Sequence, residues 1–104
     1  MNRLSQIQSL LAETPDDSFL LFALAKEYEK GGKEDKALAQ YRKLTDKAPN
    51  YVGTYYHLGK LHEERDEIPE AMAAYEKGML VAQEQGDSHA YHELQGARLN
   101  ASML

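Results

Sequence analysis

The sequence contains no cysteine and no tryptophan, and it has only two phenylalanines and three prolines among 104 residues. The lack of cysteine excludes disulfides, thiolate metal sites and cysteine nucleophiles, and it fits a cytoplasmic location. The net charge of -5 lacks the basic excess typical of nucleic-acid binding, so we expect no nucleic-acid partner. The apolar run at 19–24 is too short to span a bilayer, so we expect no membrane association.

What the chain does contain is one apolar pattern in two copies, 34 residues apart. Residues 18–51 overlay on residues 52–85 without a gap. The identical pairs are Leu24/Leu58, Lys26/Lys60, Glu29/Glu63, Ala37/Ala71, Ala39/Ala73, Tyr41/Tyr75, Lys43/Lys77 and Ala48/Ala82. A repeat of this length predicts stacked helical hairpins, and the length of the chain predicts a single domain over 1–104.

Apolar residues spaced by three or four predict four helices in the two repeats. The first covers 18–30, with Asp16 or Asp17 as its N-cap, and Gly31 and Gly32 end it. The second follows over 37–44. The third is expected at about 51–64 with Asn50 as its cap, and the fourth from about 67 past 81, with Pro69 in its first turn.

The two ends of the chain predict one further helix each. Residues 2–14 match the second helix of a repeat, through Leu4/Leu38, Leu10/Leu44 and Pro15/Pro49. Residues 87–102 predict a final capping helix, with Asp87 or Ser88 as its N-cap. A two-residue insertion before this helix puts Tyr91 and Leu94 on its packed side, whereas strict spacing would put His89 and His92 there, and we prefer the insertion.

Small residues at the repeated positions predict close contact between helix backbones. Gly78 lies inside the expected fourth helix, where glycine costs about 1 kcal/mol relative to alanine. A glycine kept at that cost indicates close packing against the next helix. The tyrosines Tyr28, Tyr41 and Tyr75 are expected to fill the space between the helical layers.

These residues resemble the tetratricopeptide repeat. The residues that match its pattern are Leu24, Tyr28, Gly32, Ala37, Tyr41 and Pro49 in one copy, and Tyr55, Leu58, Gly59, Ala71, Tyr75 and Gly78 in the other. The resemblance covers almost the whole chain. It implies an all-α fold, a right-handed α-solenoid of antiparallel helix pairs with about six helices: a half-repeat, two full repeats and a capping helix.

The resemblance also implies a small scaffold protein, whose first helices line a concave groove that binds a peptide or a partner protein. The groove residues that it implies here are Phe19, Phe22, Lys26, Tyr56, His57, Lys60, His89 and His92. Either Phe19 or Phe22 is expected to be exposed, because Leu21 and Leu24 already occupy the packed stripe. Family members that bind a terminal carboxylate use a set of basic and amide residues, of which only Lys26 has a counterpart here, so a full carboxylate clamp is not expected.

Catalysis and metal binding find little support in the sequence. His89 and His92 lie one helical turn apart, but this spacing alone is weak evidence for a metal site. The acidic residues near 63–67 cluster at a helix end, where a solvated surface is the common explanation. No phosphate-binding loop or cofactor motif occurs, so we expect neither an enzyme nor a cofactor.

The main alternative to a peptide-binding groove is a structural or assembly role as a homodimer. In that case the apolar groove residues pair two subunits, or the exposed faces of the first and last helices do so through Ile7, Leu11, Leu99 and Met103.

Overall fold

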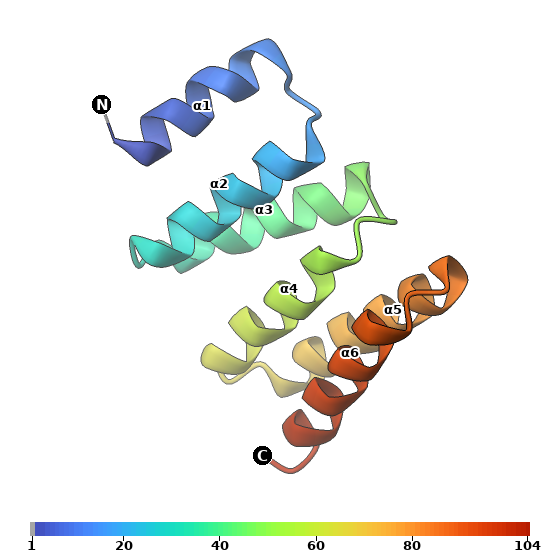
Figure 1. Cartoon of the computed structure of the whole chain (residues 1–104). Coiled ribbons are helices and arrows are strands. Elements are labelled where there is room, and N and C mark those ends of the chain that lie inside the picture. The colour runs from blue at the N-terminus through green and yellow to red at the C-terminus, as the bar shows by residue number, and fades with distance from the viewer. Residues whose placement is uncertain (1) are drawn as a thin grey trace. The chain divides into compact units, whose positions relative to one another are not determined.

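The computed structural model describes residues 2–104, so Met1, the first residue of the predicted domain, lies outside the described residues. Six α-helices and no strand occur in the described part of the chain (Figure 1). They are α1 (Arg3–Glu13), α2 (Ser18–Lys30), α3 (Glu34–Lys47), α4 (Gly53–Glu64), α5 (Ile68–Gln85) and α6 (Ser88–Ala101). None of these helices is long and apolar enough to cross a membrane.

The helices form two compact units that meet in sequence between Tyr51 and Val52. In the first unit α2 packs against both α1 and α3. In the second unit α5 packs against both α4 and α6, and α4 also touches α6. This boundary coincides with the boundary between the two sequence repeats. That residues 1–104 form a single domain, with two full repeats between two half-units, stays a prediction.

Local chemistry fixes most helix ends where the sequence predicts them. The Asp17 carboxylate accepts a hydrogen bond from the Leu20 backbone N–H at 3.0 Å, and Asp87 caps α6 in the same way through Ala90. Gly31 ends α2, and Gly32 follows it with a φ of 74°, in the left-handed region that glycine accepts without strain.

Helix α4 begins two residues later than the sequence predicts, and the cap at Asn50 stays a prediction. Helix α4 begins at Gly53, its N-cap position is occupied by Val52, and no side chain caps it there. The residues around Pro49 form a turn instead, closed by a hydrogen bond from the Tyr51 N–H to the Ala48 carbonyl at 3.0 Å.

Glycine allows the helices of the second unit to pack closely. A Cβ on Gly59 would lie 2.6 Å from Cζ of the Tyr75 ring, and a Cβ on Gly78 would lie 2.6 Å from the Tyr55 Cβ and 3.0 Å from a Leu94 methyl. These distances are shorter than carbon atoms tolerate. The close packing predicted for Gly78 is confirmed, and the neighbours belong to both α4 and α6.

The last helix has the phase that the two-residue insertion predicts. Leu94 is buried and Tyr91 is half-buried, whereas His89 and His92 are exposed. The extra residues lengthen α5 to Gln85, and Gly86 then ends it with a φ of 68°. In α1, by contrast, Ile7 is only 5% exposed, so its predicted place on an exposed dimer face is wrong: its side chain packs inside the first unit.

Candidate functional site

The first unit presents aromatic and charged side chains on α2. Phe19 lies in the first turn and is 65% exposed, so the exposure predicted for one of the two phenylalanines is confirmed. Phe22 is half-buried: its ring centroid lies 6.2 Å from that of Tyr41 and 5.8 Å from that of Tyr51. Lys26 follows one turn later and is partly exposed. This face of α2 therefore offers an aromatic surface beside a lysine.

The second unit presents a similar combination on α4. The rings of Tyr56 and His57 meet edge to face, with centroids 5.4 Å apart. The Lys60 ammonium lies 5.7 Å from the centroid of the Tyr56 ring, within the range of a cation–π contact. Both aromatic side chains are half-buried, so each keeps an edge available to a partner. Three of the predicted site residues are thus brought together on one helix.

A polar arrangement of lysine, glutamate and tyrosine recurs in both units. The Lys26 ammonium lies 3.7 Å from a Glu29 carboxylate oxygen, and the Tyr41 hydroxyl donates a hydrogen bond to the same oxygen. In the second unit Lys60 lies 3.9 Å from Glu63, which accepts a hydrogen bond from Tyr75.

Burial divides the roles within each of these two groups. Both tyrosines are fully buried, whereas the lysine side chains are 43% and 40% exposed. Burial raises the pKa of Tyr75, and the neighbouring Glu63 carboxylate raises it further, so the hydroxyl keeps its proton and remains the donor. Each glutamate is therefore held by a hydrogen bond from a buried tyrosine, and the lysine is the member of the group that is accessible to solvent.

The histidines of α6 lie apart from these contacts. The His89 side chain is 91% exposed and its Nε2 lies 3.9 Å from a Glu93 oxygen, while His92 packs edge to face on Tyr91, with centroids 5.6 Å apart. No group of three histidine, cysteine or acidic side chains able to hold a metal ion occurs within residues 2–104.

A buried histidine fixes the turn between α4 and α5. His62 Nδ1 lies 2.9 Å from an oxygen of Glu67, and the Arg65 Nε–H donates to the same oxygen at 3.1 Å. The hydrogen bond with His62 holds the pKa of Glu67 below its usual value, and Arg65 lowers it further. These contacts account for His62 as a structural residue of the turn.

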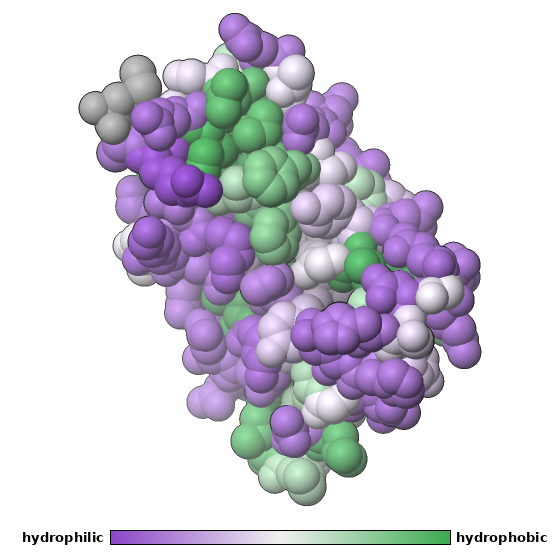
Figure 2. Space-filling model, in the orientation of Figure 1, coloured by the Kyte–Doolittle hydropathy of each residue, from purple (hydrophilic) through white to green (hydrophobic). Residues whose placement is uncertain are grey.

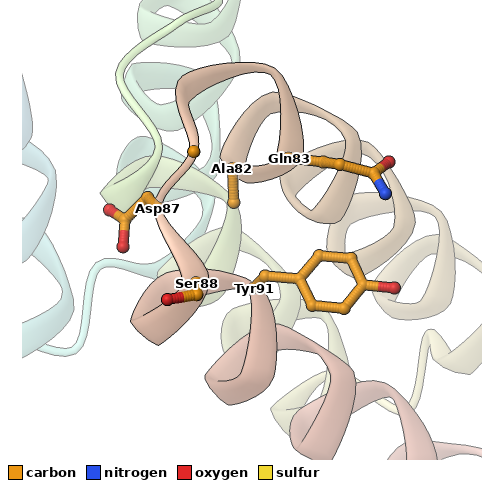
Figure 3. A pocket seen from close by; sticks show the side chains of 6 residues that line it. Ala82, Gln83, Asp87, Ser88 and Tyr91 are labelled. Carbon is orange, nitrogen blue, oxygen red and sulfur yellow. The ribbon is translucent and has the colours of Figure 1, made fainter.

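Sequence reasoning missed a small cavity at the turn between α5 and α6. It measures about 290 Å³, and Figure 3 shows the Gln83 side chain and the Tyr91 ring extending in the same direction, away from the Asp87 carboxylate. A second hollow of about 310 Å³ shares Gln83 and Tyr91 and is also lined by Arg98 and Glu76, which form an ion pair at 2.8 Å. The two-residue insertion at this turn is the sequence signal that could have pointed here.

Apolar side chains gather in two places on the visible surface. Figure 2 shows one patch in its upper part, over α1 and α2, and a smaller one near the carboxyl end of α6. The large apolar residues exposed in α1 and α2 are Leu10 and Phe19, and those in the last turn of α6 or after it are Leu99, Met103 and Leu104.

The comparisons with known proteins support the resemblance seen in the sequence. No protein-family profile matches the chain. A solved tetratricopeptide repeat domain protein from Salinibacter ruber, however, is 44% identical, superposes with a TM-score of 0.84, and is matched over 86% of this chain and 91% of that protein. The chain belongs to the tetratricopeptide repeat family. Its all-α repeat fold follows from this relationship.

Two further proteins of this kind are similar to the chain. A TPR repeat-containing protein of Pseudomonas aeruginosa is 27% identical over 88 residues, which cover 85% of this chain and 84% of that protein. PcrH, solved in complex with the chaperone binding region of PopD, has a TM-score of 0.87 over 96% of this chain and 76% of its own, at 14% identity. The likeness to PcrH shows the fold alone.

Proposed function

We propose that this protein is a non-enzymatic interaction module that binds an extended or helical segment of a partner protein through the first-helix faces of its repeats. The contacts are made by Phe22 in the first unit and by Tyr56 and His57 in the second. Lys26 and Lys60 guide the charged groups of the partner, and Phe19, His89 and His92 extend the surface. The proposal includes a cytoplasmic location, which the absence of cysteine fits.

The observation that carries this proposal is the repeated arrangement of lysine, glutamate and tyrosine. The buried tyrosine already binds each glutamate and holds its carboxylate in place, and the lysine ammonium lies 3.7–3.9 Å from that carboxylate on a partly exposed side chain. An aromatic residue lies one turn before each lysine, at Phe22 and Tyr56. An aromatic surface beside a partly exposed cation suits a peptide that carries both apolar and acidic side chains.

The likeness to PcrH supports a protein partner for this fold, since PcrH was solved with a segment of PopD. It does not carry the identity of that partner over to this chain. Affinity is expected to be modest, because a short binding face buries little area, and a protonated His57 would strengthen binding to an acidic segment.

Charge reversal at the two lysines tests the proposal without disturbing the core. Lys26→Glu and Lys60→Glu, singly and together, are compared with wild type in capture of proteins from the source cell, followed by measurement of the affinity of the captured protein. We expect its Kd to rise about tenfold or more in the double variant. The matched controls are Lys43→Glu on α3 for the single variants and Lys43→Glu combined with Lys77→Glu on α5 for the double variant, which change the net charge equally. Equal affinities for all variants, with unchanged circular dichroism, would refute the proposal.

A second candidate function is assembly of two copies of the chain through the carboxyl end of α6. Leu99 is 60% exposed and Met103 is 71% exposed, which favours an apolar contact there. Sedimentation at several concentrations decides between the two functions. A dimer that persists at low micromolar concentration and is lost in Leu99→Asp would favour assembly.

A further inference from the structure

Phe22 and Tyr56 occupy the same position in the two repeats and have the same kind of buried neighbour. The ring centroid of Phe22 lies 6.2 Å from that of Tyr41, and the ring centroid of Tyr56 lies 6.4 Å from that of Tyr75. Tyr41 and Tyr75 are both fully buried. One contact of each half-buried ring is therefore with the core, and it recurs with the repeat.

The two rings differ in a further contact. In the second unit the Lys60 ammonium lies 5.7 Å from the centroid of Tyr56, so a cation already engages this ring. In the first unit a neutral ring is a further neighbour: the centroid of Tyr51 lies 5.8 Å from that of Phe22, with the ring planes tilted by 44°. The aromatic surface of the first unit is therefore extended by a second aromatic ring.

The repeat pattern does not account for the presence of Tyr51. This residue lies outside the helices, in a turn that its own N–H closes by donating to the Ala48 carbonyl at 3.0 Å. At the spacing of 34 residues its counterpart is Gln85, at the end of α5. The Tyr51 ring is half-buried, so part of it is accessible beside Phe22. A ring placed in this way adds apolar area to a surface that the proposed function already uses.

We infer that Tyr51 and Phe22 together form a seat for one aliphatic side chain of the bound segment, which makes Tyr51 a specificity-determining residue of the first unit. The inference rests on the proposed function and adds to it the class of side chain that this unit selects. Apolar contact with two aromatic rings is favourable for an aliphatic group, and aromatic anchors of this kind contribute most of the energy at many interfaces.

Charge argues against a cationic side chain in this seat. Aromatic faces also attract cations, but Lys26 follows Phe22 by one helical turn and its side chain is 43% exposed. A lysine or arginine of the partner would meet this like charge, whereas an acidic residue next to the aliphatic one would be attracted by it. Phe19, one turn before Phe22 and 65% exposed, adds further apolar area. The segment selected here therefore carries an aliphatic residue close to an acidic one.

Two short acidic peptides are suitable probes, identical except that one has a central leucine where the other has alanine. Each is titrated into the isotopically labelled full chain at low ionic strength, and the amide resonances give the Kd and the residues that respond. We expect the wild type to bind the leucine peptide about fivefold more tightly than the alanine peptide. The largest difference between the two titrations is expected around Phe22 and Tyr51.

Variants of Tyr51 assign this preference to the seat. Tyr51→Ala should bring the two Kd values to within about twofold, while Tyr51→Phe, which keeps the ring, should retain the preference. The matched control is Tyr28→Ala, which removes another half-buried ring of the first unit, one that contacts Lys36 on α3. Lys26→Glu should weaken binding of both peptides by a similar factor. Circular dichroism confirms that each variant is folded.

The outcomes separate the seat from the proposed function. A leucine preference that persists in folded Tyr51→Ala, or that is lost equally in Tyr28→Ala, would overturn the seat. If Lys26→Glu still weakened both peptides, the proposed function would stand without it. Equal weakening of both peptides by Tyr51→Ala would show a merely structural residue and would also overturn the seat. If neither peptide shifted any resonance of α2 or α4, the chemistry proposed for these faces would fail, and the seat with it.

Discussion

Replacing Gly59 by alanine should destabilise the protein, although alanine is the better helix former. A Cβ at this position would lie 2.6 Å from Cζ of Tyr75, whose ring is fully buried and whose hydroxyl is bound to Glu63. Overpacking of a core costs about 1–3 kcal/mol, and the rigid ring places this site at the upper end. The higher helix propensity of alanine offsets about 1 kcal/mol of this cost. The free energy of unfolding should therefore fall by about 2 kcal/mol.

The same substitution at Gly96 is a matched control with the opposite sign. Gly96 lies inside α6, is exposed, and a Cβ there would meet no atom within 4 Å. Gly96→Ala should therefore raise the free energy of unfolding by about 1 kcal/mol, through helix propensity alone. For a chain of this size, a change of 1 kcal/mol shifts Tm by about 4 °C or more.

Urea and thermal unfolding followed by far-ultraviolet circular dichroism measure both variants against wild type. The two alanine variants should differ from one another by about 3 kcal/mol. A Gly59→Ala protein as stable as Gly96→Ala would refute the argument, because it would mean that α4 and α5 separate without loss of packing.

Two further predictions concern the polar contacts. Tyr75→Phe should lower the free energy of unfolding by about 1–2 kcal/mol in urea unfolding, because Glu63 loses its buried donor, and an undiminished stability would show that water replaces the hydroxyl freely. Because His62 and Arg65 hold the pKa of Glu67 below its ordinary value of 4.5, this carboxylate contributes stability above that value and loses it as the pH falls through the lowered pKa. Glu67→Gln should therefore flatten the acid side of the stability profile, whereas Glu64→Gln should follow wild type.

The repeat architecture could be predicted from the sequence because packing and glycine geometry recur at a fixed spacing. Gly32 and Asp66 lie 34 residues apart and both have a positive φ, 74° and 59°. The sequence indicates the turn at Gly32 directly, while Asp66 takes the same backbone shape without the usual signal, since aspartate tolerates it better than most residues. Only the spacing connects the two turns.

The candidate site was less predictable because its contacts depend on side-chain direction. Tyr41 and Tyr75 are expected to fill space, and they are indeed buried, but their hydroxyls also bind Glu29 and Glu63. The identity of these glutamates in both copies was the available signal. The contact of Phe22 with Tyr51 could not be predicted, because Tyr51 lies outside the helices, in a turn whose shape periodicity does not determine.

The two hairpin turns share one backbone geometry but differ in how their side chains fasten it. The Lys33 N–H donates to the Tyr28 carbonyl and the Glu67 N–H to the His62 carbonyl, each at 2.8 Å. Around Glu67 a histidine and an arginine converge on one carboxylate oxygen, whereas Gly31 and Gly32, next to Lys33, are exposed and have no side chains. Local opening should therefore be more frequent at the first turn, so that hydrogen exchange at Lys33 runs ahead of exchange at Glu67 under native conditions. Although both hairpins follow one sequence pattern, the turn of the first is therefore expected to open locally more often than the turn of the second.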